Sequence, residues 1–241
     1  GVRDICCGVE SGAFGECRRV ANMEAPASPW SWYAEIPPVS RLYLTLSVLV
    51  TLACAVDLIS PFALYYNWSL ISEGQLWRLF TNFLFFGTFG LDFLFHMYFL
   101  VRYSRLLEEN EFRGRTADFA FMLLFGASLM LCVAPFVHIH FLGSSLSFMM
   151  VYVWARRNEH VRMSFFGVVP FNAPYLPWVL LGFSTLLGHS PTIDLIGIAV
   201  GHIYYFLEFV FPAVASIRGW QTRKVLQTPA VLQYVCNHWA T

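Results

Sequence analysis

Six apolar stretches constrain the fold of this 241-residue chain more than any other feature. Hydrophobic residues make up 57% of the chain and charged residues only 12%, which is too apolar for an ordinary soluble domain. A helix crosses the hydrocarbon core with about 20 residues, and with fewer where the bilayer thins. The sequence therefore predicts an all-α membrane protein with six transmembrane helices, the fourth and fifth of them short. The stretches cover residues 42–59, 84–100, 117–136, 141–154, 176–187 and 193–210.

Basic residues lie on alternate connections between these stretches and in the terminal segments. Four arginines fall within residues 102–115 and three within 156–162, whereas the opposite connections contain only Arg78. Membrane proteins keep the Lys and Arg residues of short loops on the cytosolic side. This pattern predicts that both termini lie in the cytosol. The net charge of zero gives no indication of a nucleic-acid partner, and we expect none.

The chain divides into three predicted parts: an N-terminal cytosolic extension (1–34), a six-helix membrane domain (35–212) and a short cytosolic C-terminal tail (213–241). Residues 1–22 are polar and lack the apolar core of a secretory signal, so they read as a disordered extension or as a leader before Met23. The spacing of the six cysteines does not suit zinc, and a reducing cytosol disfavours disulfides. We expect no metal and no cofactor.

Ordered motifs run through nearly the whole membrane region. They are EIPPVSR at 35–41, WRLFTNFLFFG at 77–87, FRGRTADF at 112–119, VYVW at 151–154, PWVL at 177–180 and DLIGIAVGHIY at 194–204. Any one of them is a weak signal, but the set in this order is specific. It resembles the derlins, the rhomboid-related proteins of the endoplasmic reticulum membrane.

The resemblance implies a rhomboid-like fold and a location in the endoplasmic reticulum membrane. It also implies a role in returning misfolded luminal or membrane proteins to the cytosol for degradation. The implied partners are these clients, a ubiquitin ligase complex, a cytosolic AAA ATPase and further copies or relatives of the chain in an oligomer. Many derlins dock the ATPase through a short Gly-rich motif in the tail. Residues 213–241 contain none, so we expect either that the chain is truncated or that another subunit recruits the ATPase.

The positions of a rhomboid catalytic dyad are degenerate. A rhomboid protease needs the Ser of G-x-S-G on its fourth helix and the His that opens H-x-x-G-x-x-x-G on its sixth. Here GSSL at 143–146 retains Ser145, but Asp194 replaces the histidine. A carboxylate with a pKa near 4 is a weak base toward a serine hydroxyl. We therefore predict a pseudoprotease without catalytic residues. Ser145 leaves an active serine protease as the alternative, with His189 as the conceivable substitute base.

Asp92 and His96 form a candidate polar cavity on the second stretch. Rhomboids place H-x-x-x-N there to support the oxyanion, whereas this chain has an aspartate, which would repel that charge. Counted from Arg102, Asp92 is expected near the membrane midplane, where an ionisable side chain must face protein or water. Either it lines a cavity open to a client, or it is satisfied internally by His96 or Ser145. Asp194 and Glu208 are expected at the membrane boundary, within reach of headgroup water.

Five further residues are predicted to have structural roles. Trp77 and Arg78 should anchor the loop after the first stretch, with the guanidinium capping carbonyls or meeting phosphate. Small residues four apart let helix backbones approach closely, so Gly197 and Gly201 should pack against the fourth helix near Gly143. Ser145 fits the same interface as a small packing residue.

Three function hypotheses follow from these patterns. The first is a non-catalytic scaffold for retrotranslocation, in which short helices thin the bilayer and a polar cavity lowers the barrier to a client chain. The second is an active intramembrane serine protease. The third is a small-solute transporter, which any chain with six spans allows.

Overall fold

The computed structural model describes residues 29–137, 139–165, 169–218 and 226–239. The chain forms two compact units, residues 1–36 and residues 37–241. The first unit contains helix α2 (Pro29–Ala34), so part of the predicted extension is helical. The predicted leader, residues 1–22, lies outside the described residues.

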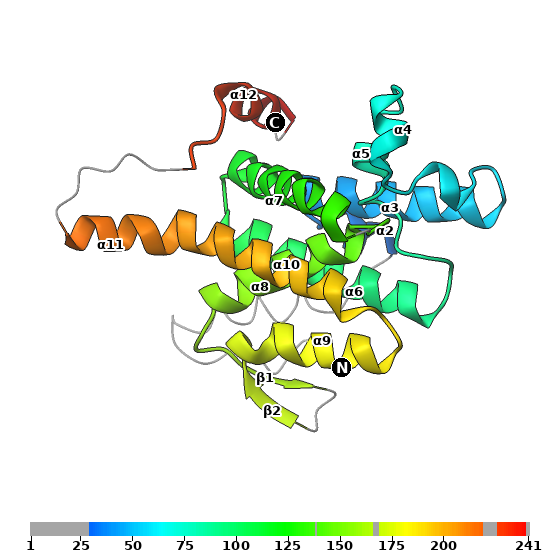
Figure 1. Cartoon of the computed structure of the whole chain (residues 1–241). Coiled ribbons are helices and arrows are strands. Elements are labelled where there is room, and N and C mark those ends of the chain that lie inside the picture. The colour runs from blue at the N-terminus through cyan, green and yellow to red at the C-terminus, as the bar shows by residue number, and fades with distance from the viewer. Residues whose placement is uncertain (1–28, 138, 166–168, 219–225, 240–241) are drawn as a thin grey trace, which may run out of the picture. The chain divides into compact units, whose positions relative to one another are not determined.

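Each of the six apolar stretches corresponds to one long helix of the second unit (Figure 1). By length and hydropathy, three helical segments of the described chain could each cross a membrane: Pro38–Ala55, Thr116–Val137 and the continuous run Pro191–Ile217. The remaining three are shorter, with 16, 15 and 11 residues. The six helices are α3 (Pro38–Ala55), α6 (Leu91–Leu106), α7 (Thr116–Val137), α8 (Gly143–Arg157), α9 (Leu176–Leu186) and α10 (Pro191–Tyr205).

Shorter elements connect these helices. The loop between α3 and α6 contains η1 (Pro61–Ala63), α4 (Trp68–Ser72) and α5 (Arg78–Thr81), and η3 (Ala173–Tyr175) precedes α9. Helix α10 continues through a π-helical turn, η4 (Phe206–Val210), into α11 (Phe211–Ile217), and α12 (Ala230–Trp239) lies in the predicted tail.

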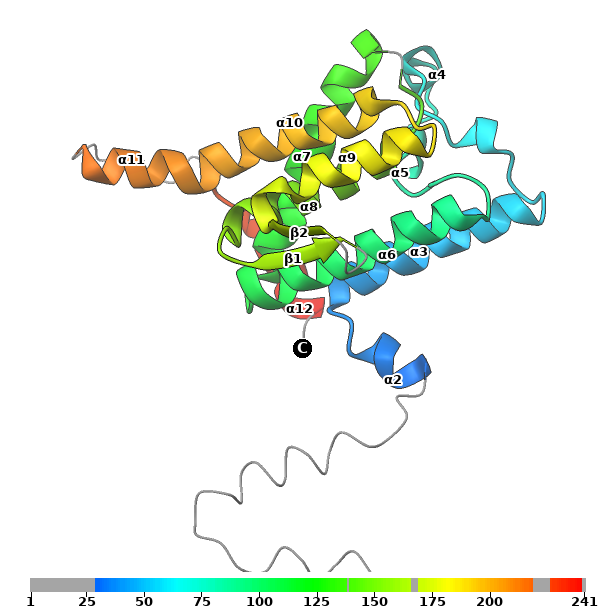
Figure 2. The same cartoon turned by 90° about the horizontal axis from the view of Figure 1, so that it is seen from below.

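Helix α8 forms the centre of the helical packing. It contacts α6, α7, α9 and α10 (Figures 1 and 2), and nearly every side chain from Gly143 to Ala155 is buried. A helix that is buried on all sides needs no polar face, which explains its run of Met, Val, Phe and Tyr residues. Helices α3 and α6 lie side by side on the other side of the unit (Figure 2).

A short hairpin between α8 and α9 was not expected from the sequence. Strands β1 (Arg162–Phe165) and β2 (Val169–Asn172) pair antiparallel, with Arg162 opposite Asn172. Polar and apolar residues alternate along β1, which is the strand period. The chain is otherwise mostly helical, as predicted, and the sequence did not indicate the hairpin because two four-residue strands give too short a pattern to compete with the helical signals around them.

The start of α3 is capped by a residue far away in the sequence. Pro37 precedes the helix and offers no side-chain acceptor for its first amides. Glu108 supplies it: its carboxylate accepts hydrogen bonds from the amide of Ser40 (2.9 Å), the hydroxyl of Ser40 (2.7 Å) and the amide of Val39 (3.2 Å). Glu108 and Ser40 are both buried. A negative charge at this end also complements the helix dipole, so this one side chain fixes the start of α3.

Glu108 lies on a π-helical turn, η2 (Leu107–Glu111), that ends α6. Such a turn admits one extra residue and redirects the side chains on it. Glu111 on the same turn bonds Arg157 of α8, with 2.7 Å between Nε and Oε2. The guanidinium carbon of Arg157 also lies 4.3 Å from the ring centroid of Phe209, on η4. Arg157 therefore links both π-helical turns at one end of α8.

Candidate functional site

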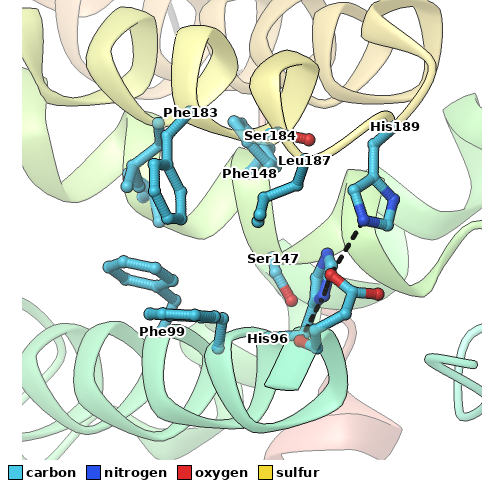
Figure 3. A pocket seen from close by; sticks show the side chains of 12 residues that line it. His96, Phe99, Ser147, Phe148, Phe183, Ser184, Leu187 and His189 are labelled. Atoms are coloured by element: carbon cyan, nitrogen blue, oxygen red, sulfur yellow. Dashed lines mark hydrogen bonds and ion pairs between the residues drawn. The ribbon is translucent and has the colours of Figure 1, made fainter. Parts of the chain in front are cut away.

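A small cavity lies between α6, α8 and α9 (Figure 3). Its volume is about 40 Å³, which is room for roughly three water molecules. Aromatic side chains, among them Phe99 and Phe183, lie at one end, and His96 and His189 lie at the other (Figure 3). The cavity is lined by Asp92, Phe95, His96, Phe99, Ser147, Phe148, Val151, Leu180, Phe183, Ser184, Leu187 and His189.

The polar end of the cavity is built by Asp92 and two histidines. The carboxylate Oδ1 of Asp92 lies 2.9 Å from Nε2 of His189 and 3.3 Å from Nδ1 of His96. Nδ1 of His96 is also 3.0 Å from the backbone carbonyl of Asp92. A carbonyl can only accept, so Nδ1 of His96 must carry a proton. His96 lies on α6 and His189 on the connection from α9 to α10, so this cluster joins two segments far apart in the chain.

Asp92 lies near one end of its helix, although it is at the centre of the apolar stretch 84–100. Helix α6 begins at Leu91 instead of near residue 84, which places Asp92 in its first turn. A carboxylate is favourable there because it complements the positive end of the helix dipole. The sequence left open whether Asp92 lines a cavity or is satisfied by His96 or Ser145. In the structure it lines the cavity, and its Oδ1 lies within ion-pair distance of His96 and His189 without a hydrogen bond of its own.

Asp194 also differs from its prediction. Only 2% of its surface is exposed, so it is not a residue at a water-accessible boundary within this fold. The Ser184 side chain lies within hydrogen-bonding reach of its carboxyl group, and His96, His189 and Asp92 act on it electrostatically. Its Oδ2 atom is buried without a hydrogen-bond partner. Asp194 therefore belongs to the same polar cluster as Asp92.

Ser145 is fully buried and hydrogen-bonded to the neighbouring helix. Its hydroxyl donates to the backbone carbonyl of Ile193, with 2.6 Å between the oxygen atoms. Within the described chain, no histidine nitrogen is a hydrogen-bond partner of this hydroxyl. His202 is instead paired with the Tyr152 hydroxyl, at 2.7 Å. The hydrogen bond of Ser145 joins α8 to α10, and Asp194 has its contacts in the Asp92 cluster. This arrangement does not resemble a nucleophile with its base.

The glycines of the predicted motif lie where α10 crosses α8. A Cβ atom added at Gly197 would overlap the backbone carbonyl oxygen of Ser145 and lie 2.8 Å from the Cβ of Phe148. At Gly201 the closest atoms would be side-chain carbons of Tyr152 at 3.1 Å, so the tighter of the two contacts is at Gly197. These distances explain why this face carries small residues.

Gly143 makes a close contact of its own. A Cβ atom there would lie 2.8 Å from the backbone carbonyl oxygen of Phe83. The amide of Leu142 bonds the carbonyl of Asn82 at 3.1 Å, so the start of α8 lies directly on the segment before α6. Gly143 thus contacts this segment, and α10 packs on the next turns of α8.

Arg78 holds the loop between α3 and α6 together. It is 6% exposed, and its Nη1 donates to the carbonyls of Phe62 (2.9 Å) and Tyr65 (3.0 Å). Its Nε donates to the side chain of Gln75 at 2.7 Å. Of the two predicted contacts of Arg78, the capping of carbonyls is the one made here. Trp77 is 54% exposed, as an indole that reaches the membrane interface would be.

Comparison with known proteins identifies the family. A family model described as the Der1-like family matches residues 36–230. The chain is 50% identical to Derlin-2.2 of Arabidopsis thaliana over 214 residues, which cover 84% of this chain and 85% of that protein. It is 44% identical to a probable derlin-2 homolog of Dictyostelium discoideum over 84% of this chain and 80% of that one. This chain belongs to the Der1-like family.

The derlin resemblance derived from the sequence motifs is therefore confirmed. A more distant derlin, Derlin-1 of Oryza sativa, is still 39% identical over 84% of this chain and 83% of its own length. Derlin membership, together with helices able to cross a membrane, identifies a membrane protein related to endoplasmic-reticulum-associated degradation.

Two members of the polar cluster in this derlin chain were not grouped with Asp92 on sequence evidence. Ser184 is one of only two hydroxyl residues on the apolar helix α9, which was the available signal. His189 was considered only as a base for Ser145, yet it pairs with Asp92. Among the described residues, no group of three or more His, Cys, Asp or Glu side chains is arranged to hold a metal ion.

Proposed function

We propose that this chain is a non-catalytic component of the retrotranslocation of misfolded proteins across the endoplasmic reticulum membrane. In this proposal helices α3, α6, α7, α8, α9 and α10 all span the bilayer, and both termini lie in the cytosol. The observation that carries it is the contact of Ser145: its hydroxyl is bonded to Ile193 of α10, while the nearby polar side chains line a cavity. Asp92, His96 and His189 give the cavity polar groups that could bind a client, whereas the hydroxyl of Ser145 has no base beside it among the described residues.

The short helices supply the second physical element of the proposal. At 1.5 Å per residue, α8 with 15 residues is about 22 Å long and α9 with 11 residues is about 16 Å long. The hydrocarbon core is about 30 Å thick, so the bilayer must thin beside these helices. A client backbone that crosses a bilayer loses the water bonded to its amides. A thinner bilayer and the carboxylate of Asp92, which lines the cavity, would both lower that cost.

Clients should contact the side of α9 that faces the cavity. We expect a photo-crosslinking amino acid at Leu187, which lines the cavity, to capture a misfolded client arrested during export. The matched control is Leu186, the preceding residue, which is 86% exposed. Equal capture from both positions would argue against a client path through this cavity.

Depletion of the protein should lengthen the half-lives of misfolded luminal proteins, and unchanged half-lives would contradict the proposed function itself.

An intramembrane serine protease is the second candidate, and Ser145 is the one observation in its favour. We expect Ser145→Ala to cost about 1 kcal/mol of stability, because one hydrogen bond between helices is lost. Client turnover should be unchanged, and a fluorophosphonate probe should label neither the parent protein nor this variant. The half-buried neighbour Ser144 provides a matched control as Ser144→Ala. Labelling that disappears only in Ser145→Ala would establish a protease.

The ubiquitin ligase complex and the AAA ATPase remain proposed partners. The derlin resemblance of the sequence implies them, and residues 213–241 contain no Gly-rich docking motif. We propose that both are recruited through other subunits. Co-purification of the ATPase with this chain alone, in a reconstituted system without further subunits, would contradict indirect recruitment.

A further inference from the structure

Helix α12, which the sequence places in a cytosolic tail, has an apolar face that the fold leaves exposed. Its ten residues, Ala230–Trp239, include no Asp, Glu, Lys or Arg. Val231, Tyr234 and Val235 are spaced by three and four residues, so they lie on one side of the helix, and each is more than half exposed. A helix in a water-exposed tail would have polar residues on this side. Another apolar surface is therefore needed to cover it.

Another side of α12 packs against α7 (Figure 1). On this side Leu232 and Cys236, four residues apart, are only partly exposed. Helix α12 lies along the side of α7 and not beyond its end, because the groove between them is lined by residues from the second to the fourth turn of α7. These residues are Phe121, Leu124, Phe125 and Ser128.

The length of α7 gives the depth of this contact. With 22 residues α7 is about 33 Å long, close to the hydrocarbon thickness of about 30 Å, so each of its ends lies near one boundary of the hydrocarbon. Phe121 and Ser128 are about 8 and 18 Å from the start of α7 at Thr116. That range is the depth of the acyl chains in one leaflet, and a helix outside the bundle at this depth is surrounded by lipid.

Polar contacts place both ends of α12 at the same end of the helical unit. Thr228, just before α12, donates its hydroxyl to the carboxylate of Asp118 in the first turn of α7. Toward the other end of α12, Glu108 of η2 acts electrostatically on Cys236. Only four residues separate η2 from α7, so Asp118 and Glu108 lie at one end of the unit. Helix α12 therefore extends across this end, and at about 15 Å it is too short to cross the bilayer.

We propose that α12 is an interfacial helix that lies in the plane of the membrane, in the leaflet where α7 begins, with acyl chains covering Val231, Tyr234 and Val235. Helix α7 spans the bilayer in the proposed function, on which this proposal rests, and its start is on the cytosolic side there. The rings of Tyr234 and His238 stack with 6.4 Å between their centroids. Such amphipathic rings suit the boundary between acyl chains and headgroups. The segment after α11 is then a membrane anchor and not a free tail.

A lipid with a photoreactive diazirine in its acyl chain tests this placement on the full parent chain. The chain is held as one copy in each phosphatidylcholine nanodisc that contains a small share of this lipid, and peptide mass spectrometry locates the adducts after photolysis. We expect adducts on Val231, Tyr234 and Val235 at a yield like that of Leu46, in the middle of α3. Val161, beside the hairpin, is the matched control and should react several-fold less, although its exposed fraction of 41% is close to the 39% of Leu46.

The pattern of adducts separates this proposal from the proposed function. Adducts on Leu46 without adducts on α12 would overturn the placement of α12 and leave the membrane-spanning helices intact. Equal yields at Val161 and Val231 would also overturn it, because the reaction would then not require burial among acyl chains. Missing adducts on Leu46 would contradict the spanning of α3, whereas the adducts on α12 decide its own placement.

A charged variant provides a second measurement. A carboxylate is costly among acyl chains, so Val231→Asp should move α12 out of the leaflet and lower the yield at Tyr234 and Val235 several-fold. The yield at Leu46 should not change, and Val161→Asp should leave the adducts on α12 unaltered. Undiminished adducts on α12 in Val231→Asp would contradict the proposal. Adducts that disappear when each disc holds two copies would show that a second copy covers this face, and would overturn it as well.

Discussion

Gly197→Ala is expected to destabilise the protein by about 2 to 3 kcal/mol, because the added methyl group overlaps the backbone of α8. Its contacts would be the carbonyl oxygen of Ser145 and the Cβ of Phe148, neither of which can move without a shift of the whole helix. The hydrogen bond from Ser145 to Ile193 would lengthen at the same time. Unfolding of the purified protein in mixed micelles of increasing dodecyl sulfate content measures the loss.

Two other glycines provide the controls. At Gly201 the nearest side-chain atoms would be 3.1 Å away, so Gly201→Ala should cost less than half as much. At Gly182 of α9 no atom lies within 4 Å of an added Cβ. Gly182→Ala should therefore be neutral, or stabilising by about 0.5 to 1 kcal/mol through the better helix propensity of alanine. A loss at Gly201→Ala that equals or exceeds the loss at Gly197→Ala would show that the two helices pack differently.

Glu108→Ala is expected to destabilise the protein by about 2 to 3 kcal/mol. The change leaves the amides of Val39 and Ser40 without their carboxylate acceptor at a buried helix start. Ser40→Ala removes only the hydroxyl donor and should cost about 1 kcal/mol. The same unfolding measurement applies, and the first turn of α3 should also lose protection against amide hydrogen exchange.

The adjacent residue Glu109 is the matched control. Its carboxylate pairs with Arg105 on a partly exposed surface, with 2.6 Å between Nε and Oε1. Exposed pairs of this kind contribute about 0 to 1 kcal/mol, so Glu109→Ala should change stability little. If Glu108→Ala were as mild as Glu109→Ala, or if exchange protection in α3 were unaffected, Glu108 would not be the cap of that helix.

The amino-acid sequence determined the helices and the family. Hydrophobic stretches long enough for helices appear directly as composition, and each of the six predicted stretches forms one long helix. The motif order indicated the derlins, and residues 36–230 match the Der1-like family. The spacing of Gly197 and Gly201 predicted a close contact between helices, because small residues four apart share one helix face, and a Cβ atom added at either position would meet atoms of α8.

Only the tertiary structure decided which polar side chains meet. Glu108 caps a helix start 68 residues away, and His189 reaches Asp92 from a connection that hydropathy describes only as a loop. Asp194 was expected at a wet boundary but is buried beside Ser184. Hydropathy specifies that a segment is a helix, but it does not specify the rotation of that helix or its register against its neighbours. Those two quantities decide every contact between distant side chains.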